Sequence, residues 1–214
     1  MKPILSFVGK SESGKTTLLA KVVPILKKRG LKIAVIKHAQ HFELDKQGKD
    51  SWLFGQMGAD TVVVSSPEEL AVMKKTDHNF TPQEIAHLID SDVDLILTEG
   101  FKKSNTMKIE VHRKAQGTKL IIPPEQLLAV VTDEPLEVSV QKFNLDDTKG
   151  LADLIEKWLQ KQPKEETELL VNGTDVPLTL FVKDIIGKII FAIISSLKDI
   201  DNIRSVLIYM KKKS

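Results

Sequence analysis

The 214-residue sequence predicts an α/β fold, in which a mostly parallel sheet carries helices on both faces and a small C-terminal α+β appendage follows. Two observations predict it. Apolar, β-branched runs alternate with stretches of helical periodicity, an order typical of parallel strands joined by crossover helices. The first apolar run leads directly into Gly9-Lys10-Ser11-Glu12-Ser13-Gly14-Lys15-Thr16, where a helix begins. A glycine loop between a strand and a helix is typical of the P-loop NTPase type of this fold.

The composition is that of an ordinary globular protein and argues against several partners. The chain has 31 basic and 29 acidic residues, a formal net charge of +2, and no cysteine. A nucleic-acid partner is not expected, because nucleic-acid binders usually show a strong basic excess. A membrane partner is not expected either, since the most apolar stretch, Phe181–Leu197, contains Lys183, Asp184 and Lys188 and suits a buried helix. No secretory signal precedes the glycine loop, so we expect a cytoplasmic protein.

The N-terminal half of the chain alternates strands, helices and one long polar segment. A helix from about Lys15 to Arg29 is predicted by apolar residues at helical spacing, with Gly30 at its end. Thr81-Pro82-Gln83-Glu84 predicts a second helix start, because it combines an N-cap, a proline at the first position and a capping glutamate. Residues 37–60 are polar and irregular, and a loop of that length is usually functional. The predicted strands are Ile4–Val8, Leu31–Ile36, Thr61–Ser65, Leu70–Met73 and Val93–Thr98.

The C-terminal half completes the main domain and adds an appendage. Strands are predicted at Lys108–His112 and Leu127–Thr132, and a closing helix at Leu151–Leu159. We therefore divide the chain into a nucleotide-binding domain, residues 1–162, and an extension, residues 163–214. The extension is predicted to contain a hairpin around Asn172-Gly173, a helix and a last strand, because Asn-Gly suits a two-residue hairpin turn. Its elements are Leu169–Val171, Val176–Leu178, Leu180–Leu197 and Ser205–Tyr209. The broad apolar stripe of that helix predicts packing in its own core or in a dimer.

The glycine loop has the complete Walker A pattern for binding phosphates. Gly14 can adopt backbone angles that a side chain would forbid, and it allows close approach of an anion. The helix that begins there adds free N–H donors and the positive end of its dipole. Lys15 is expected to contact the β- and γ-phosphates, the Thr16 hydroxyl to ligate Mg²⁺, and Thr17 to approach the α-phosphate.

A carboxylate near Mg²⁺ is expected at the end of a neighbouring apolar strand. Glu99 ends the strand Val93–Thr98, where ligands bind in open α/β sheets. Asp94 lies at the start of the same strand and is the weaker candidate. Directly after Glu99, Gly100 permits a sharp turn, and Lys102 could reach an anionic ligand.

The long polar segment contains further candidates. His38, His41 and Asp45 could be interpreted as a metal cluster, although histidines on a loop more often form hydrogen bonds or remain solvated. We favour a switch-like loop, in which Asp45 reaches Mg²⁺ or its waters and Lys49 meets phosphates or a second anionic ligand.

Several motifs in a fixed order make the chain resemble the molybdopterin-guanine dinucleotide biosynthesis protein B (MobB) family over about residues 2–160. The segments that carry the resemblance are Gly9–Thr17, Ile36-Lys37-His38 with His41 and Asp45, Gly48-Lys49-Asp50-Ser51, Gly58-Ala59, Glu99-Gly100-Phe101-Lys102, and Lys108-Ile109-Glu110 followed by Arg113.

The resemblance implies a homodimeric P-loop protein that binds GTP with Mg²⁺ and hydrolyses it slowly. It also implies an adaptor role beside the guanylyltransferase that attaches GMP to molybdopterin. By position, Gly9 to Thr17 would hold phosphates, and Thr16 and Glu99 would serve the metal. Asp45 and the Gly48–Ser51 segment would belong to the mobile site loop. Lys15, Asp45 and Glu99 are therefore the expected catalytic residues.

The sequence departs from many GTPases because it has no Asn-Lys-x-Asp motif for reading guanine. Asp133, which follows a strand, is a possible substitute, since its carboxylate could accept hydrogen bonds from guanine N1 and N2. Two alternatives to the adaptor remain open: an ATP-dependent small-molecule kinase or metabolic ATPase, and a pure interaction module. No arginine finger or water-positioning glutamine is identifiable, which agrees with slow turnover.

Overall fold

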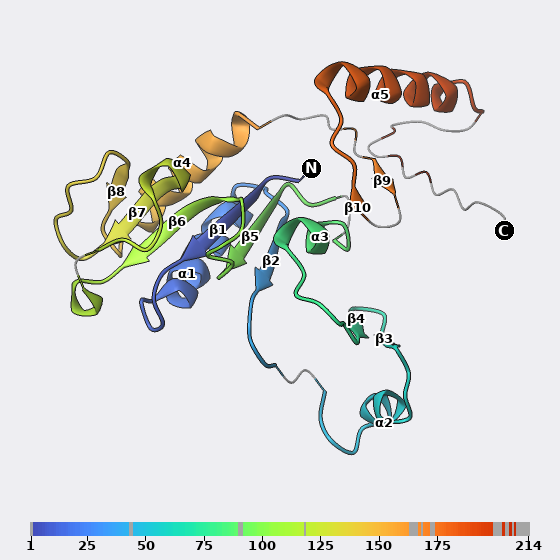
Figure 1. Cartoon of the computed structure of the whole chain (residues 1–214), viewed down its shortest axis with the longest axis horizontal. Helices are drawn as coiled ribbons and strands as arrows, with labels where there is room; N and C mark the ends of the chain where they lie inside the picture. Colours follow the sequence, from blue (N-terminus) through green and yellow to red (C-terminus); the bar gives the residue numbers. More distant parts are fainter. Residues whose placement is uncertain are drawn as a thin grey trace.

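The computed structural model describes residues 2–42, 45–89, 92–117, 119–162, 167, 169–171 and 174–198, together with residues 203, 206 and 208. Its centre is a six-stranded sheet in the order β2-β5-β1-β6-β7-β8, and all of its neighbouring strands are parallel (Figure 1). The strands are β1 (Ile4–Val8), β2 (Ile33–Lys37), β5 (Leu95–Glu99), β6 (Met107–His112), β7 (Leu127–Thr132) and β8 (Gln141–Phe143). The predicted fold class is confirmed.

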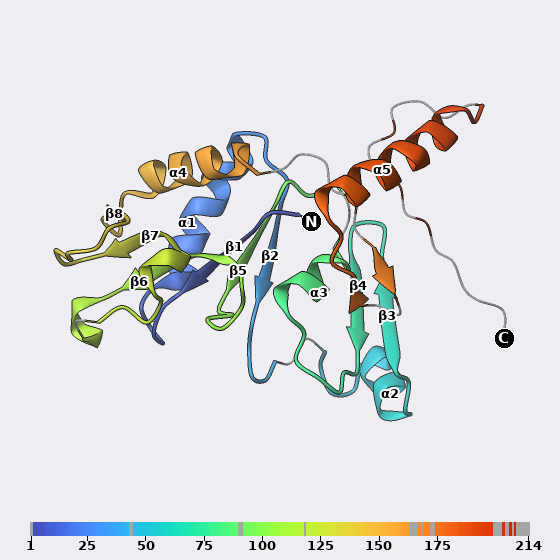
Figure 2. The same cartoon turned by 45° about the horizontal axis from the view of Figure 1, so that its top comes forward.

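One face of this sheet is covered by α1 (Lys15–Lys28) and α4 (Thr148–Gln160), which lie side by side in Figure 2. Alternate residues of the central strands point toward these helices and form the main core. Leu5 and Phe7 of β1 are fully buried against Leu26 of α1 and Ile155 of α4. The core fixes β1 and α1 together, and the glycine loop joins them.

The opposite face is covered mainly by connecting segments. The short helix α3 (Pro82–Ala86) packs there against Ile4, Ile36 and Ile96. Its predicted capping box is confirmed, since the Thr81 hydroxyl accepts from the Glu84 N–H and the Glu84 carboxylate accepts from the Thr81 N–H. Helices therefore lie on both faces, as predicted.

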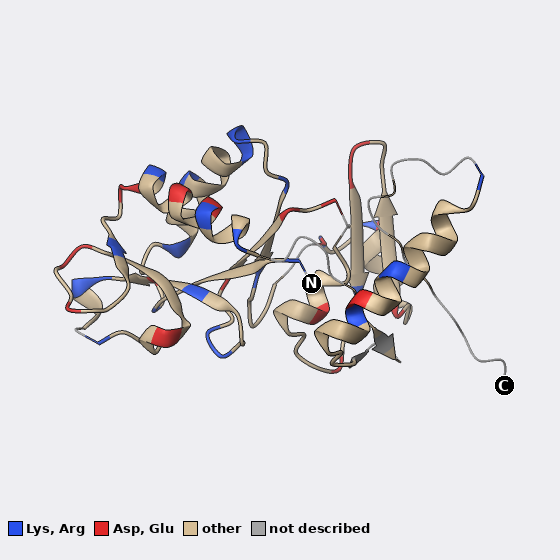
Figure 3. Ribbon diagram, turned by 90° about the horizontal axis from the view of Figure 1, so that it is seen from above, with Lys and Arg blue, Asp and Glu red and all other residues tan. Residues whose placement is uncertain are grey.

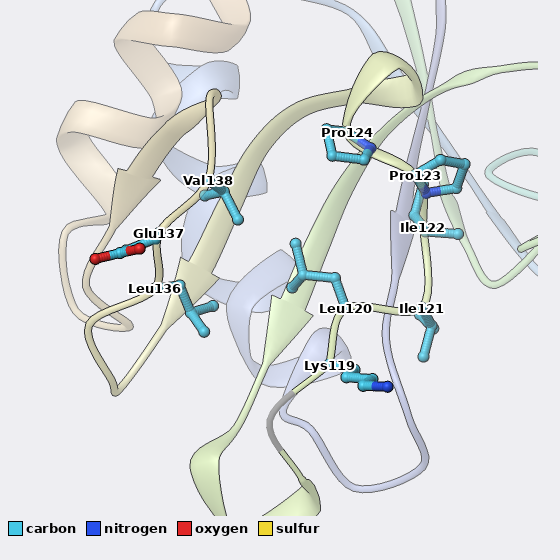
Figure 4. Close-up of a pocket in the computed structure, with 9 residues that line it drawn as sticks. All are labelled: Lys119, Leu120, Ile121, Ile122, Pro123, Pro124, Leu136, Glu137 and Val138. Carbon is cyan, nitrogen blue, oxygen red and sulfur yellow. The ribbon is translucent and has the colours of Figure 1, made fainter.

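The rest of this face lies under the segments that precede and follow β7. The 3₁₀ turns η1 (Lys114–Gln116) and η2 (Pro124–Gln126) belong to the first of them. An open cavity of about 510 Å³ separates the two segments, and Figure 4 shows apolar side chains pointing into it. Its lining is Lys119–Pro124 and Leu136–Val138, away from the glycine loop.

A second unit comprises α2 (Asp50–Gln56) and the antiparallel hairpin β3 (Thr61–Ser65) and β4 (Leu70–Lys74). Figure 1 shows it apart from the main sheet, as a separate α-β unit between β2 and α3. The hairpin is predicted by the sequence, but the irregular structure predicted for all of residues 37–60 is wrong, since α2 forms there. No residue of α2 is buried, so the segment lacks the core-facing stripe that would have revealed it.

The extension contains a hairpin and a helix. β9 (Leu170–Val171) pairs antiparallel with β10 (Thr174–Asp175), so the second arm begins two residues before the predicted Val176–Leu178. The observed register places residue 174 directly opposite residue 171, which brings the two arms closer in sequence than the predicted bounds allow. The predicted strand Ser205–Tyr209 lies largely outside the described residues, and the predicted division at residue 162 stays a prediction.

Helix α5 (Leu180–Ser195) follows the hairpin and is apolar around most of its circumference. Figure 3 shows only a few charged positions along it. None of its residues is buried among the described residues of the single chain, so the first of the two predicted alternatives, packing in its own core, is not formed there. The second alternative, packing in a dimer, stays a prediction. In the part of the chain that the structure describes, no helix combines the length and apolar character needed to cross a bilayer.

Candidate functional site

The glycine loop lies at the carboxyl end of β1, between β5 and β6. Gly9 is buried where the chain leaves β1, and a Cβ there would lie 2.4 Å from the Val111 carbonyl oxygen of β6. Only glycine fits at that distance. Gly14 has φ +94° and occupies the N-cap of α1 without a capping side chain. The N–H groups of the first helical turn are therefore available to an anion, as the sequence predicts.

The hydroxyl of Ser13 adds a second polar group to the loop. Ser13 is fully buried and its Oγ has no hydrogen-bond partner within the described part of the molecule. A buried hydroxyl without a partner is costly unless a ligand or water completes it. The loop therefore presents backbone donors and an unsatisfied hydroxyl, which suits a phosphate group.

Lys15 lies across the loop. Its ammonium donates to the Lys10 carbonyl oxygen at 2.6 Å. Partial burial lowers the pKa of Lys15; nearby Glu99 opposes that shift, while Lys102 and Lys37 add to it. Three ammonium groups thus gather around one carboxylate, and this excess of positive charge favours a polyanionic ligand such as a triphosphate.

The Mg²⁺ candidates Thr16 and Glu99 meet directly, although 83 positions separate them in the sequence. The Thr16 hydroxyl donates to the two Glu99 carboxylate oxygens at 2.8 and 2.9 Å, and Lys37 Nζ lies 3.9 Å from one of them. A hydroxyl and a carboxylate are oxygen ligands of the kind that Mg²⁺ prefers beside nucleotide phosphates. The residues present therefore fit the ion.

Replacing Glu99 with glutamine should remove most of the Mg²⁺ enhancement of nucleotide affinity. The amide keeps the shape of the side chain but loses the charge, and we expect the enhancement to fall by about tenfold. Calorimetric titration with GTP, with Mg²⁺ and with chelator, measures it. Glu68→Gln, on the exposed turn between β3 and β4, is the matched control. An unchanged Mg²⁺ effect in Glu99→Gln would refute the assignment.

The turn after Glu99 is held in an unusual conformation. Gly100 has φ +104° and a Cβ there would lie 3.1 Å from the His38 Cβ. Phe101 adopts φ +54°, which is rare for a large side chain, and its ring lies 4.7 Å from the imidazole of His38. The same turn places Lys102 near Lys15, where the sequence suggested that it could reach an anion.

The polar side chains beneath this turn are buried, which the sequence did not predict. Lys108 is fully buried, and its ammonium donates to the Ser104 and Thr106 carbonyl oxygens at 2.6 and 2.9 Å. Burial lowers the pKa of Lys108. Hydroxyls continue the network across β1 to Thr98, the residue before Glu99. The network anchors the segment between β5 and β6, and strand alternation gave no signal of it because these residues occupy core positions.

Asp45 and Lys49 lie in the segment that leads into α2, and Lys49 is the N-cap residue of that helix. Asp45 accepts hydrogen bonds from the Lys46 N–H at 2.9 Å and the Ser51 hydroxyl at 3.1 Å, while Lys49 lines a cavity of about 380 Å³ beside β3. None of these contacts reaches the glycine loop, so their predicted roles there stay predictions. Among the described residues no three His, Asp or Glu side chains are arranged to hold a metal ion, and the alternative cluster of His38, His41 and Asp45 is not formed.

Asp133 follows β7, and both of its carboxylate oxygens accept hydrogen bonds. One oxygen accepts from the Lys114 N–H at 2.9 Å and the other from Arg113 Nη1 at 3.3 Å. These hydrogen bonds, that of Lys114 first, lower the pKa of Asp133. Its neighbour Glu134 meets the buried His112 at 2.7 Å. The predicted reading of guanine by Asp133 stays a prediction.

Residues 4–133 match the model of a family described as molybdopterin guanine dinucleotide synthesis protein B, or MobB. The chain belongs to the MobB family. A relative from Escherichia coli, named molybdopterin-guanine dinucleotide biosynthesis adapter protein, is 39% identical over 172 residues, which cover 76% of this chain and 96% of that protein. A crystal structure described as MobB is 34% identical, with a TM-score of 0.55 over 74% of this chain and 99% of its own.

A further MobB relative, from Methanocaldococcus jannaschii, extends the match. It is 27% identical over 227 residues, which cover 95% of both chains. About a quarter of this chain therefore lacks a counterpart in the E. coli protein but is largely matched in the M. jannaschii relative.

Proposed function

We propose that this chain is a GTP-binding adaptor that assists the attachment of GMP to molybdopterin, the step that makes the guanine dinucleotide form of molybdenum cofactor. The meeting of Thr16 with Glu99 at the mouth of the glycine loop carries the nucleotide part of the proposal. Family membership and the adapter name of the E. coli relative support the pathway. The predicted cytoplasmic location remains part of the proposal.

Within this proposal each group has one task. The amides of residues 9–17 bind the phosphates, Lys15 neutralises part of their charge, and Thr16 and Glu99 would hold Mg²⁺. When bound, the ion would neutralise charge on the phosphate oxygens. Slow hydrolysis is expected, because no arginine among the described residues is free to stabilise the charge of the transition state. Arg113 lies against the loop, but it already donates to the Ser13 carbonyl oxygen and to Asp133.

We also propose a homodimer, because the α2 unit exposes an apolar surface. Val63, Val64, Leu70 and Val72 of the hairpin are 44–68% exposed in the single chain. Burying such a surface between two copies would be favourable by about 25 cal/mol for each Å². Mass measurement of the intact chain and of a version ending at Lys161 would show whether a dimer forms and whether the extension is needed.

The decisive test is nucleotide binding followed by a reconstituted reaction. Titration of the full chain with GTP and ATP, with and without Mg²⁺, should show Mg²⁺-dependent preference for GTP. Adding the chain to a guanylyltransferase with molybdopterin and GTP should raise the yield of the dinucleotide cofactor. Preference for ATP with fast, substrate-dependent turnover would instead identify a kinase or metabolic ATPase.

A further inference from the structure

The segment of residues 113–117, which follows β6, is bonded to the glycine loop by side chains from both sides. Arg113 Nε donates to the Ser13 carbonyl oxygen at 3.1 Å, and the Gln116 side-chain amide donates to the Ser11 carbonyl oxygen. In return the Lys10 ammonium donates to the Gln116 carbonyl oxygen. The two segments, about 100 residues apart in sequence, are therefore joined by hydrogen bonds that each segment donates to the other.

Peptide geometry gives these bonds a directional consequence. The carbonyl of one residue and the N–H of the next share a planar trans peptide and point in opposite directions. Holding the Ser11 carbonyl toward Gln116 therefore points the Glu12 N–H away from the 113–117 segment. Holding the Ser13 carbonyl toward Arg113 does the same for the Gly14 N–H.

The loop needs such support because its backbone is strained. Glu12 has φ +61°, a left-handed conformation that costs a side-chain-bearing residue of order 1 kcal/mol. Gly14, two residues later, is also left-handed. Bonds from outside the loop hold these angles in place before any anion arrives.

Asp133 fixes the far side of the 113–117 segment. Its two oxygens accept from the Lys114 N–H and from Arg113 Nη1, so it holds the segment at both the backbone and the guanidinium. Arg113 thus bridges Asp133 and the glycine loop. The carboxylate acts on the loop through Arg113.

We infer that Gln116 and Arg113 are positioning residues that aim the Glu12 and Gly14 amides at the phosphate chain, with Asp133 as their anchor. The inference rests on the proposed nucleotide binding and deepens it. These residues act on the phosphate chain and not on the base. Removing Gln116 or Arg113 should therefore lower the binding affinity of every ligand that carries the same phosphates, and by the same factor.

Gln116→Met in the full chain tests this directly. Methionine keeps the length of the side chain and its neutrality but removes the donor. Affinity for GTP, ATP and inorganic tripolyphosphate should each fall by about fivefold, the effect of one net hydrogen bond. Gln160→Met, exposed at the end of α4, is the matched control and should leave all three affinities unchanged.

A spectroscopic signature separates positioning from general destabilisation. Amide protons that bind phosphate shift downfield, so tripolyphosphate should shift both the Glu12 and the Gly14 amide signals in the wild type. In Gln116→Met the Glu12 shift should shrink while the Gly14 shift, supported by Arg113, persists. Wild-type tripolyphosphate affinity in the variant, or an unchanged Glu12 shift, would overturn the inference.

Asp133→Asn distinguishes the anchor from a base reader. If Asp133 is an anchor, the Asp133→Asn variant should bind GTP, ATP and tripolyphosphate with affinities that are lowered by the same factor. A changed ratio of GTP to ATP affinity with unchanged tripolyphosphate affinity would assign Asp133 to the base and overturn its role as anchor. If the wild type bound none of the three ligands, the proposed function itself would fail.

Discussion

Lys15→Ala is expected to abolish measurable GTP binding. The ammonium now spans the loop to the Lys10 carbonyl oxygen, within the cationic group formed with Lys37 and Lys102. Truncating one member of a desolvated charge pair typically costs 2–5 kcal/mol. We therefore expect the affinity for GTP with Mg²⁺ to fall by about thirtyfold to several thousandfold, as measured by calorimetry.

The fold should survive this change, because Lys15 is only partly buried and contributes nothing to the apolar core. The melting temperature without nucleotide should stay within a few degrees of the wild-type value. Lys27→Ala, at the exposed end of the same helix, is the matched control and should bind normally. Unchanged GTP affinity in Lys15→Ala would refute the nucleotide site as a whole.

Gly9→Ala should be the second most damaging change. The added methyl carbon would lie 2.4 Å from the Val111 carbonyl oxygen and 2.6 Å from the Ser13 hydroxyl. A backbone oxygen cannot rotate away, so the glycine loop must separate from β6. We expect a loss of about 2–3 kcal/mol in unfolding free energy, typical of overpacking, and GTP affinity reduced by at least about a hundredfold.

Gly30→Ala separates steric clash from glycine's conformational freedom. Gly30 also has a left-handed φ, +88°, but nothing lies within 4 Å of a Cβ built there. Its substitution should cost about 1 kcal/mol of stability and leave GTP affinity unchanged. Urea unfolding and calorimetry on both variants measure the contrast, and equal GTP affinities in the two variants would contradict our explanation of Gly9.

The sequence predicted the structure best at positions where the local geometry accepts only one or a few residue types. The glycine loop, the Thr81 capping box and Glu99 at a strand end each follow from such rules, and the structure has the loop, the box and Glu99 in those places. Thr16 and Glu99 could be paired in advance because parallel strands end at one edge of the sheet.

Other features had no such signal. β8 is three residues long and only Phe143 in it is buried, too little for a strand pattern. The bond from the Gln116 amide to the Ser11 carbonyl oxygen joins a common side chain to a backbone group, and other long side chains with an N–H donor could have made it. The apolar pattern of α5 predicted burial, but no residue of the helix is buried against the described part of the single chain. Its burial in a dimer stays a prediction.

The parallel sheet also sets when the molecule can first acquire its ligand during synthesis. β1 pairs with β5 and β6. Ile4 can therefore pair with Ile96, and Val8 with Glu110, only after those residues have left the ribosome. Contacts of such wide separation form late and slowly. A nascent chain of fewer than about 110 residues contains the glycine loop but lacks the complete β5 and β6 strands that hold β1 and the loop in place. A nucleotide therefore has no formed site to bind on that chain, and its apolar β1 stays exposed until β6 has been made.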